Sequence, residues 1–197
     1  MSSPMSNLKY DAFRVFGCFS ILKIIKGFVF YRTFRPVVTM RLCQYVNTRN
    51  TLGRLVQPLF NLLHRIATGF AGIDFSWRTQ IGGGFIFTHA WGAVINEKAI
   101  IGQNVTIFHG VTIGRLDKIN ADGERITGYP IVEDEVWIGP HAIIVGGIRI
   151  GRGSRIAGGT FINFDVPAYS VVSGNPGGLT KSNCIPDVYN RAPLDQY

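Results

Sequence analysis

Aliphatic residues recur at every sixth position through the second half of the chain. A first run extends from Ile95 to Ile113, and the same spacing resumes from Val132 to Ile162. The aliphatic positions are Ile95, Ile101, Ile107, Ile113, Val132, Ile138, Ile144, Ile150, Ile156 and Ile162. A small or β-branched residue stands two positions before most of them. A period of six does not fit the period of two of an ordinary strand.

Three such hexapeptides can form one triangular coil of a β-helix. The aliphatic side chain would point inward and stack on its counterpart eighteen residues further on, and the small residue would lie near a corner, where there is little space. Adjacent coils would hydrogen-bond as parallel strands about 4.8 Å apart. Because one coil cannot bury its own inner face, several coils must stack. The sequence therefore predicts a parallel β-helix over residues 71–180.

The N-terminal third has a helical spacing of apolar residues instead. Two groups of apolar residues fall on helical faces, Leu42, Tyr45 and Val46 in the first, and Leu55, Leu59, Leu62, Leu63 and Ile66 in the second. Pro36 and Pro58 limit or bend these helices. The fold class is thus mainly β with an α N-terminal region, in which about three helices occupy residues 1–70. Residues 181–197 are expected to form a C-terminal tail.

Two irregularities interrupt the six-residue register. Ile81 and Ile95 are fourteen residues apart, so two extra residues lie within the segment 88–92. A longer insertion, residues 115–129, separates the two runs of the repeat. Functional sites are often placed where a regular scaffold is interrupted, so both breaks are candidate positions for a site.

Four short motifs around the first break resemble one known family. Gly72-Ile73-Asp74, the segment 81–84 (IGGG), His89-Ala90-Trp91-Gly92 and the segment 111–114 (VTIG) are similar to the core signature of serine acetyltransferases and of their polysaccharide-acetylating relatives. The resemblance covers roughly residues 60–180. It implies that the β-helix is left-handed, that the protein is a homotrimer with active sites between neighbouring subunits, and that acetyl-CoA is the donor.

The resemblance also assigns catalytic roles. His89 would be the general base and Asp74 would orient it, at the family's spacing of fifteen residues. The chemistry agrees, because a neutral imidazole can take the proton of an attacking hydroxyl and a carboxylate on its far nitrogen stabilises the imidazolium. His109 is a second candidate that would lie beside His89, where it could bind the acceptor or stabilise the oxyanion. The alternative for His109 is a turn residue bonded to the backbone.

Departures from the serine enzymes direct the choice of acceptor. Thr88 stands where those enzymes carry an Asp, and Gly128-Tyr129 replaces their Arg-His pair. A site for a charged amino acid is thus expected to be missing. We therefore predict a sugar hydroxyl of a bacterial surface or capsular polysaccharide, or of its precursor, as acceptor, with Thr88, Trp91 and Tyr129 as substrate-binding residues. Serine acetylation, a non-catalytic scaffold and a zinc enzyme on the same fold are the alternatives.

The donor site is expected along the later coils. Backbone groups near Gly114, Gly139 and Gly158 could contact the pantetheine arm of acetyl-CoA. Arg149 and Arg155 are six residues apart, so we expect them in one column, facing either the CoA phosphates or solvent. We expect no metal.

Charge is concentrated at the N-terminus. Residues 1–70 contain ten Lys or Arg and one acidic residue, Asp11, although the whole chain has a net charge of +8. This segment could contact an anionic membrane surface or an acidic glycan, or could be an ordinary helical face. Three scattered cysteines favour a reducing, cytoplasmic compartment. We expect peripheral membrane contact at most, because Lys23 and Lys26 interrupt the apolar stretch 13–30, and no nucleic-acid partner.

Overall fold

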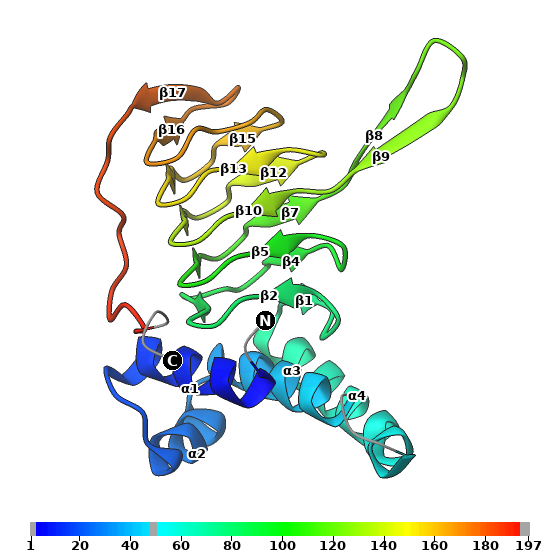
Figure 1. The fold of residues 1–197 in the computed structure, drawn as a ribbon, viewed down its shortest axis with the longest axis vertical. Helices are drawn as coiled ribbons and strands as arrows, with labels where there is room; N and C mark the ends of the chain where they lie inside the picture. The colour runs from blue at the N-terminus through cyan, green and yellow to red at the C-terminus, as the bar shows by residue number, and fades with distance from the viewer. Residues whose placement is uncertain (1–2, 48–50, 194–197) are drawn as a thin grey trace.

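The computed structural model describes residues 3–47 and 51–193. Four helices precede the strands, one more than the sequence suggested (Figure 1): α1 (Pro4–Phe16), α2 (Ile21–Phe30), α3 (Phe34–Asn47) and α4 (Thr51–Ala71). The apolar stretch 13–30 is divided between two of them, because Gly17 adopts the left-handed conformation that ends α1. Among the described residues, no helix has the length and apolar character needed to cross a membrane.

The rest of the chain winds into the predicted left-handed parallel β-helix, which has three faces. The first face contains β1 (Asp74–Phe75), β4 (Val94–Ile95), β7 (Thr112–Gly114), β12 (Ile143–Val145) and β15 (Phe161–Ile162). The second face contains β2 (Gln80–Ile81), β5 (Ile100–Ile101), β10 (Ile131–Val132) and β13 (Arg149–Ile150). The third face contains β3 (Ile86–Phe87), β6 (Thr106–Ile107), β11 (Trp137–Ile138), β14 (Arg155–Ile156), β16 (Val171–Ser173) and the antiparallel β17 (Gly178–Lys181).

The repeated aliphatic residues form the core of this β-helix. Ile95 pairs in register with Ile113, and Ile138 with Ile156, in each case eighteen residues further on. These isoleucines are at most 3% exposed. The inward stacking predicted from the six-residue period is therefore confirmed, and it accounts for most of the buried apolar side chains of the molecule.

Both predicted irregularities are present. Ile86 pairs with Thr106, twenty residues on, whereas Val94 pairs with Thr112, eighteen residues on, so two extra residues lie between β3 and β4. The insertion at 115–129 is a two-stranded hairpin, β8 (Leu116–Ile119) with β9 (Arg125–Gly128), that projects from the body of the β-helix (Figure 1).

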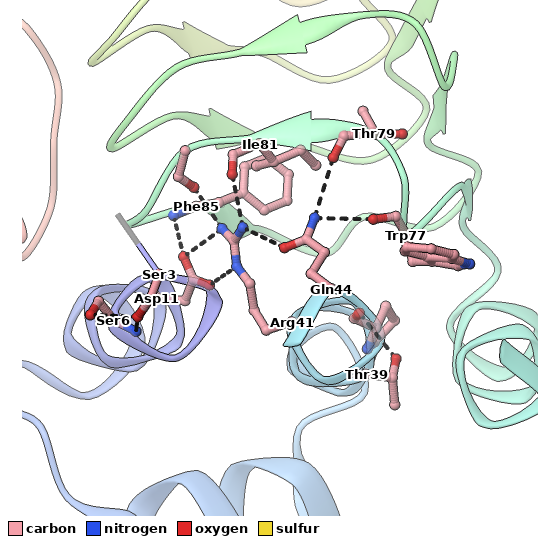
Figure 2. A network of polar contacts seen from close by, with 12 residues as sticks. Ser3, Ser6, Asp11, Thr39, Arg41, Gln44, Trp77, Thr79, Ile81 and Phe85 are labelled. Carbon is pink, nitrogen blue, oxygen red and sulfur yellow. Dashed lines mark hydrogen bonds and ion pairs between the residues drawn. The ribbon is translucent and has the colours of Figure 1, made fainter. Parts of the chain in front are cut away.

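The helical region docks on the first coil of the β-helix through buried polar side chains (Figure 2). Asp11 of α1 and Arg41 of α3 form an ion pair, with 2.8 Å between Oδ2 and Nε and both side chains 0% exposed. Arg41 also donates to the carbonyl oxygens of Ile81 and Gly82, and Asp11 accepts from the Phe85 amide. Burial raises the pKa of the Asp11 carboxyl, and the Arg41 guanidinium partly offsets this.

A second buried arginine joins three parts of the chain. Arg14 of α1 donates to the Gly84 carbonyl, to Thr106 Oγ1 and to the Tyr189 carbonyl, each at 2.8 Å. Burial lowers the pKa of its guanidinium to about 10, so the side chain is charged at neutral pH. Tyr189 belongs to the C-terminal segment, which returns along the β-helix to α1 (Figure 1).

Two helices expose apolar side chains. In α2 only Gly27 is buried, and Leu22 and Phe30 are 74% and 73% exposed. On α4 the exposed apolar residues are Leu55, Leu59, Leu62, Leu63, Ile66 and Phe70. Exposed apolar faces of this size mark surfaces that contact another molecule.

Candidate active site

The segment around His89 forms one corner of the β-helix. It links β3 on the third face to β4 on the first face, where the two extra residues lie. His89 has a φ of 57°, in the left-handed region that only a minority of non-glycine residues adopt. Its side chain is exposed, and its carbonyl accepts a hydrogen bond from Arg32 Nη2 at 3.1 Å. The corner therefore presents an accessible imidazole on a backbone of unusual conformation.

Asp74 lies at the same corner, on the strand below. It begins β1, pairs in register with Val94, and its amide donates to the Ala93 carbonyl at 2.9 Å. Its carboxylate is exposed like the imidazole of His89. No hydrogen bond or ion pair joins these two described side chains. In free enzymes catalytic hydrogen bonds are often long and tighten only when substrate binds.

Thr88 and Trp91 flank His89 in different ways. Thr88 is half-buried, and its amide extends the parallel ladder to the Ile107 carbonyl at 2.8 Å. Trp91 is 62% exposed, and the Arg32 guanidinium lies 4.9 Å from its ring centroid. The indole also covers Gly72, where an added Cβ would be 2.9 Å from Trp91 Cε3. One side of the indole is therefore already occupied by packing within the chain.

His109 lies in the next coil, at the position that corresponds to His89. Phe87 pairs with Ile107, and both histidines follow two residues later. The ring of His109 contacts His141 of the coil above, with 4.9 Å between centroids and the rings nearly perpendicular. Its Nδ1 is buried without a hydrogen-bond partner. An unpaired buried acceptor or donor is costly, so this nitrogen is a candidate to bind a group that enters the site.

Sequence reasoning gave His141 no chemistry and missed its contact with His109. Thr112 pairs with Ile143, thirty-one residues on, because the hairpin adds thirteen residues to one coil. The same offset places His141 directly above Gly110 in the stack, and its amide donates to the His109 carbonyl at 2.9 Å. Subtracting the insertion from the sequence separation would have revealed this pair.

Tyr129 lies at a different corner of the same chain. The hairpin that precedes it leaves β7 on the first face and returns to β10 on the second, whereas His89 joins the third face to the first. The Tyr129 ring is half-buried, with Lys98 Nζ 5.1 Å from its centroid. A single chain thus does not bring Tyr129 together with Thr88, His89 and Trp91.

The residues predicted to bind the donor are also spread over the β-helix. Gly139 and Gly158 pack closely, since an added Cβ at Gly139 would be 2.8 Å from the Gly158 amide nitrogen. Gly114 ends β7, on a different face. The expectation that Arg149 and Arg155 share a column is wrong, because residues six apart lie on successive faces and only residues eighteen apart stack. Both arginines are in ion pairs, with Glu133 at 2.8 Å and with Asp187 at 2.5 Å.

A cavity of about 450 Å³ opens beside His89, between the helical region and the first coil. Its lining includes Arg32 and Thr33 from the α2–α3 linker, and Thr88 and His89 from the corner. Most other lining residues are apolar, with Phe30, Tyr31, Phe34, Phe85 and Phe87 among them.

Comparison with known proteins supports the resemblance of the motifs. A model of the bacterial transferase hexapeptide (six repeats) matches residues 129–163. The solved soybean serine acetyltransferase complexed with serine is 31% identical, with a TM-score of 0.67, over 90% of this chain and 68% of that one. The chain belongs to the hexapeptide-repeat acyltransferase family.

Other members of this family are similar over much of the chain. The serine acetyltransferase of Bacillus licheniformis is 38% identical over 121 residues, which are 61% of this chain and 54% of the relative. The solved serine acetyltransferase of Neisseria gonorrhoeae superimposes over 98% of this chain and 71% of its own, with a TM-score of 0.69 and 26% identity. The chain spans about half the length of the Bacillus relatives it matches.

The predicted polysaccharide acceptor is wrong in the light of these relatives, which are serine acetyltransferases. The prediction gave too much weight to Thr88 and to Gly128-Tyr129, two local differences at separate corners. It also relied on Trp91 and Tyr129 as residues that bind the sugar. Both rings already have cationic partners within the chain, Arg32 and Lys98. The resemblance to polysaccharide-acetylating enzymes is likewise unsupported.

Proposed function

We propose that this protein transfers an acetyl group from acetyl-CoA to the hydroxyl of L-serine. The observation that carries the proposal is the 38% identity to a serine acetyltransferase, over a region that includes the His89 corner and its accessible imidazole.

His89 acts as the general base in this proposal. It removes the proton of the serine hydroxyl as the oxygen attacks the thioester carbonyl, and the proton leaves with the CoA thiol. Asp74 fixes the imidazole tautomer and stabilises the imidazolium. The unpaired Nδ1 of His109 is available to the acceptor or to the oxyanion. Transfer is direct, without an acetylated enzyme.

The same proposal includes the residues that contact the acceptor and the donor. Thr88, Trp91 and Tyr129 surround the acceptor, and the backbone near Gly114, Gly139 and Gly158 contacts the pantetheine arm. Arg149 and Arg155 remain candidates for the CoA phosphates only if their ion pairs with Glu133 and Asp187 open.

A homotrimer completes this site. Tyr129 and His89 lie at different corners of one chain, so a site that uses both needs the hairpin of a neighbouring copy. Sedimentation equilibrium should give three times the chain mass of 21.8 kDa, and a stable monomer with full activity would contradict the assembly.

The test of the function is the release of thiol from acetyl-CoA with L-serine, together with detection of O-acetylserine by mass spectrometry. His89→Ala should lower kcat by about a thousandfold, because the general base is lost. His141→Ala is the matched control: His141 is also an exposed histidine at positive φ (58°), and this variant should keep at least a tenth of the activity. Absence of O-acetylserine at saturating acetyl-CoA would refute the proposed function.

The peripheral membrane contact also stays a proposal. Its support is the apolar surface of α2, which carries Lys23 and Lys26 and belongs to a strongly basic segment. Cosedimentation with vesicles of anionic lipid should exceed that with zwitterionic vesicles and should fall in Leu22→Asp. Equal binding to both vesicle types would reject it.

A further inference from the structure

Arg32 connects the helical region to the His89 corner. It lies in the short linker between α2 and α3, residues 31–33, and its side chain is half-buried. One guanidinium nitrogen donates to the Ala71 carbonyl and the other donates to the His89 carbonyl. The guanidinium carbon also lies over the Trp91 ring, 4.9 Å from its centroid. A single side chain of the helical region thus contacts three residues at or next to the corner, Ala71, His89 and Trp91.

The three contacts lie in the two chain segments that carry the proposed general base and its carboxylate. Ala71 immediately precedes the Gly72-Ile73-Asp74 segment, whereas His89 and Trp91 belong to the loop with the two extra residues. The Gly92 amide donates to the Gly72 carbonyl at 2.7 Å, which gives one further link between the segments. Arg32 spans the same junction with its bonds to the Ala71 and His89 carbonyls.

The backbone of the loop needs such a link. A non-glycine residue in the left-handed region is held there at a cost of about 1 kcal/mol, so its surroundings must keep it in place. The Arg32 bond to the His89 carbonyl acts directly on that residue. A guanidinium is suited to this task because its planar fork can donate in two directions while its face stacks on an aromatic ring, which a lysine ammonium cannot do.

We propose that Arg32 is a positioning residue, which fixes the His89 loop relative to the segment that carries Asp74. The inference rests on the proposed function for its kinetic consequence, but its structural part stands on the contacts alone. Arg32 does not touch the reacting atoms. Its effect on the reaction passes through the carbonyl of His89 and the ring of Trp91.

Arg35 provides a matched control three residues away. It also donates to two carbonyl oxygens, those of Phe28 and Val29, but both belong to α2. Its replacement removes the same charge and a similar number of hydrogen bonds from the helical region. It does not act on the His89 corner.

The experiment compares Arg32→Ala, Arg32→Lys and Arg35→Ala with the full-length wild-type protein. Arg32→Ala should lower kcat by about a hundredfold, the effect of misplacing a catalytic group by about 1 Å, while KM for acetyl-CoA changes less than about twofold. Arg32→Lys should recover little of the loss. Arg35→Ala should stay within about twofold of wild type in kcat.

A second readout does not depend on the reaction. Hydrogen exchange of the amides of residues 88–93 should be faster in both Arg32 variants and unchanged in Arg35→Ala. If wild type acetylates no serine, the proposed function fails, and the exchange data alone decide the role of Arg32. Wild-type exchange in Arg32→Lys, or equal effects of Arg32→Ala and Arg35→Ala, would overturn the proposal. If Arg32→Ala does not fold, the Arg32→Lys result decides.

Discussion

The β-helix and the helical region differ in the side chains that they bury most completely. Among the largest fully buried side chains of the β-helix, all but Phe85 are isoleucines, and they stack in register, as with Ile138 and Ile156. The helical region exposes large apolar residues on α2 and α4, and besides the apolar side chains of α1 and α3 it fully buries the charged Asp11, Arg14 and Arg41 against the first coil. The two regions therefore follow different rules, although they belong to one continuous core cluster.

The difference arises at the end of a parallel stack. Each inner coil finds hydrogen-bond partners in the coils on either side, but the first coil has a strand on one side only. Its remaining backbone groups would be buried without partners under the helices, which is costly. Arg41, Arg14 and Gln44 donate to its carbonyl oxygens instead, at Ile81, Gly82, Gly84 and Trp77. Polar side chains thus replace the missing strand.

Breaking the buried ion pair should have the largest effect on stability. Asp11→Ala leaves the Arg41 guanidinium buried without its partner, so the free energy of unfolding should fall by about 3–5 kcal/mol in urea denaturation. Arg78→Ala, in the exposed pair with Glu97, should change it by less than about 0.5 kcal/mol. A small effect of Asp11→Ala would mean that the helices do not depend on this polar contact.

The apolar stack should show a graded response to lost volume. Ile138→Ala should destabilise by about 2–4 kcal/mol and Ile138→Val by about 1 kcal/mol, because Ile138 is 0% exposed and a cavity replaces the removed atoms. Leu62→Ala on α4 is the control, since Leu62 is 55% exposed and should contribute little to monomer stability. Equal losses for Ile138→Ala and Leu62→Ala would contradict the contrast between the two regions.

His64 should give the smallest effect, visible only as a dependence on pH. It is buried between Thr39 Oγ1 (2.9 Å) and the Phe75 carbonyl (3.3 Å), so Nε2 carries the proton and Nδ1 accepts. Burial lowers its pKa below 6.5, so the folded chain binds this proton less readily than the unfolded chain. Stability should therefore fall as the pH falls below 6.5.

The measurement for His64 is urea denaturation at about pH 7.5 and about pH 5.5. Wild type should lose more stability between these two conditions than His64→Gln, which cannot titrate. An identical loss in both proteins would show that other groups cause the pH dependence.

Sequence periodicity predicted the regular β-helix and little of the contact between the helical region and its first coil. The isoleucine spacing predicted the β-helix, and gaps in that spacing located the His89 corner and the hairpin, because every coil obeys the same rule. Asp11 and Arg41 are thirty residues apart on separate helices and follow no repeat, so their pairing was not predictable. The helical spacing of α4 likewise did not reveal that His64 is buried against Thr39 and Phe75. The contacts of Arg32 with Ala71, His89 and Trp91 were not predictable either, because they also join distant residues that follow no repeat.

Arg14 also constrains the order in which the parts of the chain can fold. Its hydrogen bond to the Tyr189 carbonyl joins residues 175 positions apart, and the bond from Asn190 Nδ2 to the Arg14 carbonyl joins residues 176 positions apart. During synthesis the helices leave the ribosome first, yet this arginine acquires its last partners only after nearly every coil has been made. Contacts of such high sequence separation form late and slow the folding of a chain. The C-terminal segment should therefore dock on α1 in the final step of folding.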